Sequence, residues 1–173
     1  MNNPDAVFIS YHLEHSKFSI SIHKLIQVIM KKKDKQELSY YGLLLLSYLK
    51  ESHPEKADDN DFIRLRSELA SEAYTNAVIN GYTQQSAEEI ASSILYEGLL
   101  FSRYDTIRNV LINEFTIVPS ERINSLALEL LLPCEEVFSE YPVNDTFASS
   151  PEYTALYTEL VGFIDIWREE NEL

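Results

Sequence analysis

Residues 83–99, TQQSAEEIASSILYEGL, carry the clearest helical pattern in the chain. Thr83 or Ser86 can cap the start of a helix, and the apolar side chains that follow recur every three or four residues. This predicted inward face contains Ala87, Ile90, Ala91, Ile94, Leu95 and Leu99. The stretch therefore predicts an amphipathic helix that packs against other helices.

Upstream, residues 37–52 are apolar around most of a helical circumference, so we expect this helix at the centre of a bundle. It should end at His53, because Pro54 disfavours the helical conformation in the residue before it. Asp59 or Asn60 can cap the next helix. The predicted inward face of that helix contains Phe62, Leu65, Leu69, Ala73, Ala77 and Val78.

Downstream, capping residues predict four more helices. Asp105 is placed to cap a helix that Pro119 ends, and Ser120 is placed to cap the next one. Pro133 opens a short helical piece, and Ser150, with the proline after it, starts the last helix. The whole chain has only four Gly and six Pro, fewer than a sheet protein normally needs for its turns. We predict an all-α fold, a single compact bundle of about six or seven helices.

The charge of the chain changes sign near residue 36. Residues 1–36 hold six of the 14 basic residues and three of the 28 acidic ones, a net charge of +3. The other 137 residues hold 8 basic and 25 acidic residues, a net charge of −17. We therefore divide the chain into a basic N-terminal extension, 1–36, and an acidic all-helical domain, 37–173.

Within the extension, Met30 stands directly before three lysines. We interpret Met30 as the true start of the protein and residues 1–29 as an upstream extension. The rival interpretation is functional, because Phe18, Ile20 and Ile22 alternate like a strand and the next apolar residues suit a short helix.

The net charge of residues 37–173 limits the classes of ligand. It repels phosphate backbones and anionic membranes, so we expect no direct nucleic-acid binding and no membrane association. No apolar run approaches the roughly 20 residues that span a bilayer, and the N-terminus lacks the features of a signal peptide. With one cysteine the chain forms no intrachain disulfide, and a cytoplasmic location is the simplest expectation.

Candidate catalytic residues are few. After the extension, His53 is the only histidine and Cys134 the only cysteine, and nothing next to Cys134 in the sequence would lower the pKa of its thiol. The acidic run 58–61 lacks the ligand spacing of a calcium loop, and the four glycines are isolated. We expect no enzyme activity, no cofactor and no metal.

The last helix contains the candidate partner surface. Two tyrosines spaced by four residues suit either a partner surface or the rim of the core. Several carboxylates gather where the helix dipole is negative, which disfavours each by about 0.3–1 kcal/mol unless a cation approaches or the helix end frays into water. The candidate surface consists of Tyr153, Tyr157, Asp165, Glu169, Glu170 and Glu172.

Several stretches are similar to a known family. They include LSYYGLLLLSYLKESHPE at residues 38–55, EAYTNAVINGYTQQSAEEIA at 72–91 and VFSEYPVNDTFASSPEYTALYTEL at 137–160. On these segments the chain resembles an uncharacterised all-helical family, a domain of unknown function from Bacteroides-type bacteria that is commonly encoded in conjugative transposons. The resemblance covers residues 37–173. It implies a bacterial cytoplasm and association with a mobile element, and it implies no site residue.

The sequence favours a non-enzymatic accessory or binding protein of a mobile element that engages a basic protein partner. The first alternative is a DNA-mimic inhibitor of a DNA-binding enzyme, which would need carboxylates in ordered rows that approximate phosphate spacing. The second alternative is an enzyme of unrecognised class that works with carboxylates and tyrosines. Nothing in the sequence specifies an oligomeric state.

Overall fold

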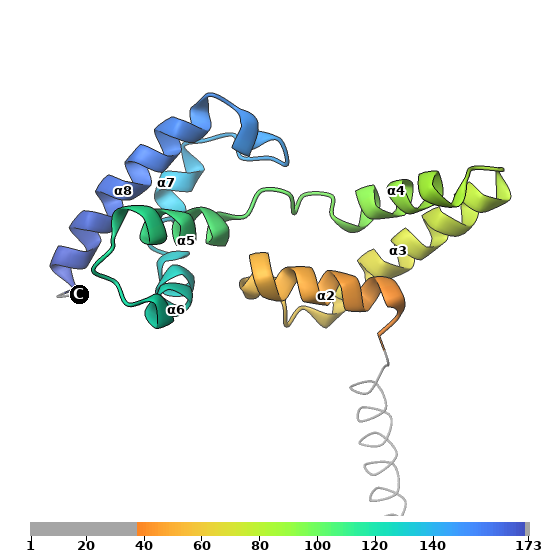
Figure 1. The fold of residues 1–173 in the computed structure, drawn as a ribbon, viewed down its shortest axis with the longest axis horizontal. Coiled ribbons are helices and arrows are strands. Elements are labelled where there is room, and N and C mark those ends of the chain that lie inside the picture. Colours follow the sequence, from red (N-terminus) through yellow and green to blue (C-terminus); the bar gives the residue numbers. More distant parts are fainter. Residues whose placement is uncertain (1–37, 172–173) are drawn as a thin grey trace, which may run out of the picture. The chain divides into compact units, whose positions relative to one another are not determined.

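The computed structural model describes residues 38–171, and this part of the chain contains helices and no strands (Figure 1). The α-helices are α2 (Tyr40–Ser52), α3 (Asn60–Ile79), α4 (Gln84–Leu95), α5 (Arg103–Glu114), α6 (Ser120–Leu130), α7 (Glu135–Ser139) and α8 (Glu152–Glu170). Two 3₁₀ turns, η1 (Pro54–Lys56) and η2 (Phe147–Ser149), follow α2 and precede α8. The predicted all-α fold is confirmed.

Some predictions fall on residues that are not described. They are the basic extension at residues 1–36 with its start at Met30, and Glu172 of the candidate partner surface. Within residues 38–171, no helix combines the length and the hydrophobicity that a bilayer crossing requires.

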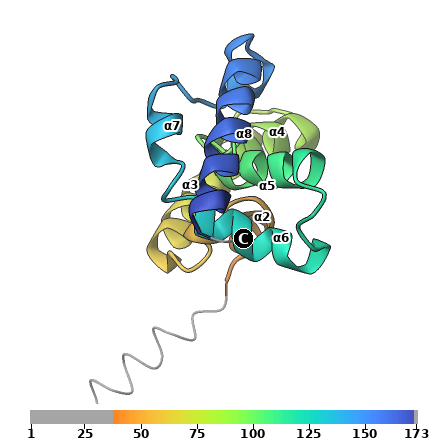
Figure 2. The same ribbon diagram turned by 90° about the vertical axis from the view of Figure 1, so that its left-hand side faces the viewer.

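The buried apolar side chains form two clusters, one for each group of consecutive helices. The N-terminal cluster joins α2, α3 and α4 and consists of Leu45, Leu49, Ile63, Ala70, Ala91, Leu95 and Leu99. The C-terminal cluster joins α5 to α8, where α8 lies between α5 and α7 (Figure 2). Its largest fully buried residues are Phe138, Phe147, Ile107, Leu111, Leu130, Leu156 and Leu160.

Side-chain caps explain where several helices begin. Ser39, Asp59 and Thr83 each accept a hydrogen bond from the main-chain N–H three residues later, which satisfies one of the free N–H groups of the first turn. The prediction for α5 is wrong by three residues. Ser102 is the cap and accepts from the N–H of Asp105 at 2.8 Å, so Asp105 lies in the first turn.

The start of α6 also differs from the prediction. Ser120 is the first residue of this helix rather than its cap, and Pro119, which has no side-chain oxygen, occupies the cap position. The fixed φ of proline suits the extended backbone at this position, so the helix begins here without a side-chain hydrogen bond.

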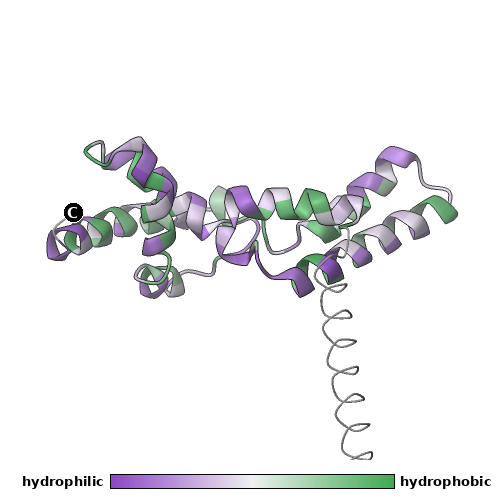
Figure 3. Cartoon of the chain, turned by 90° about the horizontal axis from the view of Figure 1, so that it is seen from below, coloured by the Kyte–Doolittle hydropathy of each residue, from purple (hydrophilic) through white to green (hydrophobic). Residues whose placement is uncertain are grey.

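α2 does not lie at the centre of a bundle, contrary to the prediction. Its buried residues are Gly42, Leu45 and Leu49, whereas Leu43 on the opposite side is 58 % exposed. Each helix displays both hydrophobic and hydrophilic residues along its length (Figure 3). α2 packs in its cluster with residues of α3, of α4 and of the segment after α4, and its other face stays open to solvent.

α3 is rotated relative to its predicted inward face. Its buried residues are Ile63, Ser67, Ala70 and Ala77, whereas Leu65 and Leu69 are 55 % and 45 % exposed. Small side chains on this buried face allow close approach to α4, which buries Ala87 and Ala91 in turn. The packed face of α3 therefore consists mainly of small residues, while Leu65 and Leu69 stay exposed.

Candidate functional site

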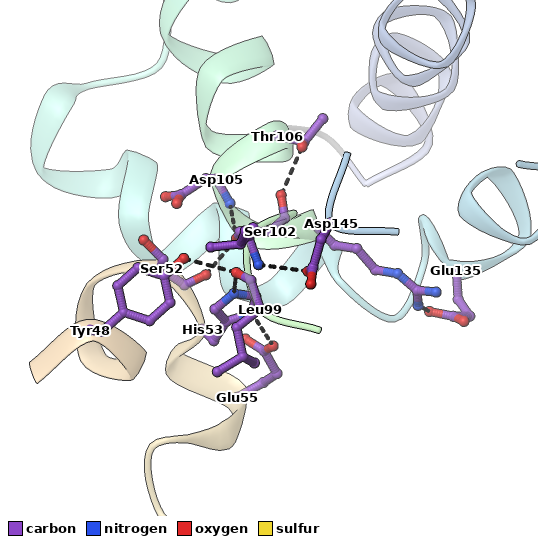
Figure 4. A network of polar contacts seen from close by, with 12 residues as sticks. Tyr48, Ser52, His53, Glu55, Leu99, Ser102, Asp105, Thr106, Glu135 and Asp145 are labelled. Atoms are coloured by element: carbon purple, nitrogen blue, oxygen red, sulfur yellow. Dashed lines mark hydrogen bonds and ion pairs between the residues drawn. The ribbon is translucent and has the colours of Figure 1, made fainter. Parts of the chain in front are cut away.

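The segment between α4 and α5, residues 96–102, is held by side chains from two other parts of the chain (Figure 4). Gly98 has φ +75°, a left-handed conformation that glycine adopts without strain. The Asp145 carboxylate accepts from the N–H of Gly98 at 2.7 Å and from the N–H of Leu100 at 2.9 Å. One carboxylate therefore binds both main-chain donors that flank Leu99.

The C-terminal end of α2 holds the same segment from another direction. The Leu99 carbonyl oxygen accepts from the Tyr48 hydroxyl and from His53 Nε2, both at 2.8 Å, and the Ser102 hydroxyl donates to the carbonyl of Ser52. Since a carbonyl only accepts, His53 Nε2 carries a proton. We call Tyr48, Ser52, His53, Leu99, Ser102 and Asp145 the junction network.

His53 is only 3 % exposed, and its second ring nitrogen faces Glu55. Nδ1 lies 3.4 Å from Glu55 Oε1. Burial by itself raises the pKa of Glu55, but the hydrogen bond and charge of His53, a backbone hydrogen bond and Lys56 together lower that pKa below its ordinary value. Glu55 is therefore ionised at neutral pH and stabilises the orientation of the imidazole.

A groove of about 850 Å³ lies beside the junction network, and we call it the junction groove. Its apolar lining comes from Phe101, Leu131, Leu132 and Val143. Its charged lining comes from Glu55, Lys56, Glu97, Arg103, Glu135 and Asp145. Arg103 pairs with Glu135 and lies over the Phe138 ring, 5.3 Å from its centroid, which ties α5 to α7.

The only cysteine is not placed for nucleophilic chemistry. Cys134 is fully buried in the C-terminal cluster, and burial raises the pKa of its thiol to about 12. The two ring nitrogens of His53 face the Leu99 carbonyl and Glu55, so they are not directed at the thiol of Cys134. No group of three metal-ligating side chains occurs within residues 38–171.

The burial of Cys134 predicts slow reaction with a thiol reagent such as DTNB. The thiolate is the reactive form, and a pKa raised from 9.0 to about 12 lowers its population at about pH 8 roughly a thousandfold. We expect the native chain to react at least this much more slowly than the chain unfolded in guanidinium. Equal rates before and after unfolding would show that the thiol is accessible in the native state.

The structure separates the two parts of the predicted partner surface on α8. Tyr153 and Tyr157 are half-buried against the C-terminal cluster, and the Tyr157 hydroxyl donates to Glu114 Oε1 at 3.0 Å. Burial and the Glu114 carboxylate raise the pKa of Tyr157. In contrast, the α8 carboxylates Asp165, Glu169 and Glu170 are exposed. The tyrosines therefore anchor α8, while these carboxylates face solvent.

Sequence reasoning missed Glu152 and Glu159 of α8 and the carboxylates at α7. Residues 135–170 contain nine acidic residues and one basic residue, Arg168, a count that the sequence already offered. α7 packs against α8, and Tyr141, which follows α7, has its pKa raised by loss of hydration and then by a hydrogen bond to Glu159 of α8. We call the following eight exposed carboxylates the acidic surface: Glu135, Glu136, Glu140, Glu152, Glu159, Asp165, Glu169 and Glu170.

The described residues define an all-helical domain whose two helical groups meet at a side-chain network and an open groove. The chain belongs to the family described as Domain of unknown function (DUF1896), which it matches over residues 33–173. It is also similar to protein PG0816 from Porphyromonas gingivalis, known from a crystal structure. The two chains share 45% sequence identity with a TM-score of 0.75, over 82% of this chain and 97% of that chain.

A comparison with curated proteins gave no match. The predicted relationship to an uncharacterised helical family is confirmed, and the similarity to a Bacteroidetes protein is consistent with the Bacteroides-type origin implied by the resemblance.

Proposed function

We propose that this chain is a non-enzymatic binding protein that engages a basic protein partner through the acidic surface of α7 and α8. The observation that carries the proposal is the excess of exposed carboxylates there, eight of them along a segment with one basic residue. Such a surface attracts cationic partners and repels nucleic acid.

The arginines in the rest of the domain support this choice of surface. Arg64, Arg66, Arg108 and Arg122 each lie within 4.0 Å of a carboxylate outside the acidic surface, whereas Arg103 pairs with Glu135 of that surface. Arg66 also donates to the carbonyls of Ile94 and Glu97 at 2.8 and 2.9 Å, where it caps the end of α4. These contacts occupy Arg64 and Arg66, the close basic pair that a nucleic-acid site would have used.

The end of α8 is the part of the acidic surface with the most to gain from a cation. Glu169 and Glu170 lie in the last turn, where the helix dipole is negative and each carboxylate is disfavoured. Ile166, 60 % exposed, lies one turn before Glu170 and adds an apolar contact. A basic partner would relieve the repulsion and cover this side chain.

The proposal extends to the setting of the protein. The resemblance to a family commonly encoded in conjugative transposons supports an accessory role in a mobile element within a bacterial cytoplasm. Proteins that process DNA carry basic surfaces, so they are the first partners to test.

The test is affinity capture with the full chain from native lysate at low and high salt. We expect the combined variant Glu159→Gln, Glu169→Gln, Glu170→Gln to weaken binding of the captured partner about tenfold, since each exposed pair contributes about 0.2–1 kcal/mol. The matched control neutralises three exposed carboxylates elsewhere, Glu51, Glu72 and Glu121.

Each outcome of this test has a distinct meaning. Salt-sensitive capture that only the α8 variant weakens supports the proposal. Capture that both triple variants weaken equally, or that neither weakens, contradicts it. Salt-sensitive capture of a DNA-binding enzyme that duplex DNA competes away would instead favour the DNA mimic.

A further inference from the structure

We propose that the junction groove receives a large apolar side chain from a cationic segment of the partner. This inference rests on the proposed function for the identity of the partner and adds the site of its apolar anchor. The central observation is Leu132, which is 84 % exposed where it lines the groove. An exposed leucine beside a groove is a favourable contact for an apolar group.

The main chain on both sides of Leu132 holds its side chain in an exposed position. The neighbouring residues Leu130 and Cys134 are fully buried in the C-terminal cluster. The Cys134 N–H donates to the Leu130 carbonyl at 2.9 Å, and the Glu135 N–H donates to the Leu132 carbonyl at 3.2 Å. The side chain therefore projects from a turn that is fixed on both sides, and binding would require little ordering of the chain.

Other residues of the groove lining are also preformed. Gly98 and Asp145 both line the groove, and the Gly98 N–H donates to the Asp145 carboxylate. Phe101, which is half-buried, packs edge-on against the buried ring of Phe147 with centroids 5.2 Å apart. An entering apolar side chain would therefore meet Phe101 and Leu132 in positions that already exist.

The charge around the groove selects a cationic segment. Its lining holds four carboxylates, Glu55, Glu97, Glu135 and Asp145, against one lysine and one arginine. Arg103 is paired with Glu135, whereas Glu97 is 76 % exposed at the side chain and lies 3.8 Å from Arg66. Glu135 belongs to both the groove and the acidic surface, so one basic segment can contact both.

The test uses two synthetic peptides of equal length and charge, one alternating Lys and Leu and the other alternating Lys and Ser. Their binding to the isotope-labelled full chain is followed by NMR. We expect the Lys/Leu peptide to bind about tenfold more tightly and to shift the amide signals of Gly98, Leu100 and Leu132.

Leu132→Ser should remove the preference for the Lys/Leu peptide. The matched control Leu128→Ser, on an exposed apolar residue of α6, should retain it. Unchanged urea midpoints would show that both variants fold. Equal binding of the two peptides to the native chain, or a preference that survives Leu132→Ser, would overturn the inference.

The Gln variant of α8 separates this inference from the proposed function. If it weakens both peptides equally while Leu132→Ser removes only the Lys/Leu preference, both proposals are supported. If Leu132→Ser acts but the α8 variant does not, the groove is supported and the acidic surface is contradicted. If only the α8 variant acts, the acidic surface is supported and the groove is contradicted.

Discussion

Phe138→Ala is expected to lower the free energy of unfolding by about 3–5 kcal/mol, the range for removing a fully buried phenylalanine. Phe138 is fully buried, its ring meets Phe101 edge-on with centroids 6.4 Å apart, and Arg103 lies over it. Truncation therefore leaves a cavity and also removes the platform for the ion pair between α5 and α7.

Equilibrium urea unfolding measures this loss with two probes. Far-UV circular dichroism reports on all helices, and the fluorescence of Trp167, the only tryptophan, reports on the C-terminal cluster against which it packs. Leu128→Ala, at an exposed position of α6, is the matched control and should cost less than about 1 kcal/mol. A loss below about 1 kcal/mol for Phe138→Ala would contradict the packing described for this cluster.

His53→Ala has the next largest expected effect, a loss of about 2–3 kcal/mol. The substitution removes a buried ring, deprives the Leu99 carbonyl of one of its two donors and leaves the ionised Glu55 without its hydrogen-bond partner. Lys50→Ala, at an exposed position of α2 three residues earlier, should stay within about 0.5 kcal/mol of the native chain. Equal urea midpoints for the two variants would show that the junction network contributes nothing to stability.

A double-mutant cycle of His53→Ala and Asp145→Asn tests whether the contributions of these two residues to stability are coupled. Asp145→Asn removes one of the two acceptors for the Gly98 and Leu100 N–H groups, so this variant alone should also be destabilised. Because His53 and Asp145 hold the same three-residue segment, their effects should depart from additivity by about 0.5–3 kcal/mol. Strict additivity would mean that the two contacts are independent.

Local sequence patterns predicted the elements well where a helix has one apolar face and a distinct cap. Pro54 explains where α2 ends and Thr83 explains where α4 begins, because each residue acts on the adjacent backbone alone. The orientation of α3 could not be derived in this way, because both faces carry apolar residues. The buried face of α3 consists mainly of small side chains. The periodicity of apolar residues shows which positions share a face, but it does not show how closely two helices approach each other.

The junction network could not be predicted from local sequence patterns, for a related reason. His53 and Leu99 are 46 residues apart, and Asp145 and Gly98 are 47 apart, and each contact uses a main-chain atom on one side. Nothing in the side chains of Gly98 or Leu99 indicates those partners. Asp165, Glu169 and Glu170 were predicted because they gather at the end of the last helix in the sequence, whereas Glu152, Glu159 and the carboxylates at α7 were not included, because their place beside that helix end depends on packing.

The use of a main-chain oxygen at residue 99 has an evolutionary consequence. Every amino acid supplies that carbonyl, so the side chain at this position is selected only for its place in the N-terminal cluster. Substitutions of Tyr48 and His53, whose side chains share the oxygen, should therefore covary with each other and not with the residue at position 99. Contact inference from covariation among relatives would consequently miss the linkage between the end of α2 and the segment that follows α4 at this position, even with a deep alignment.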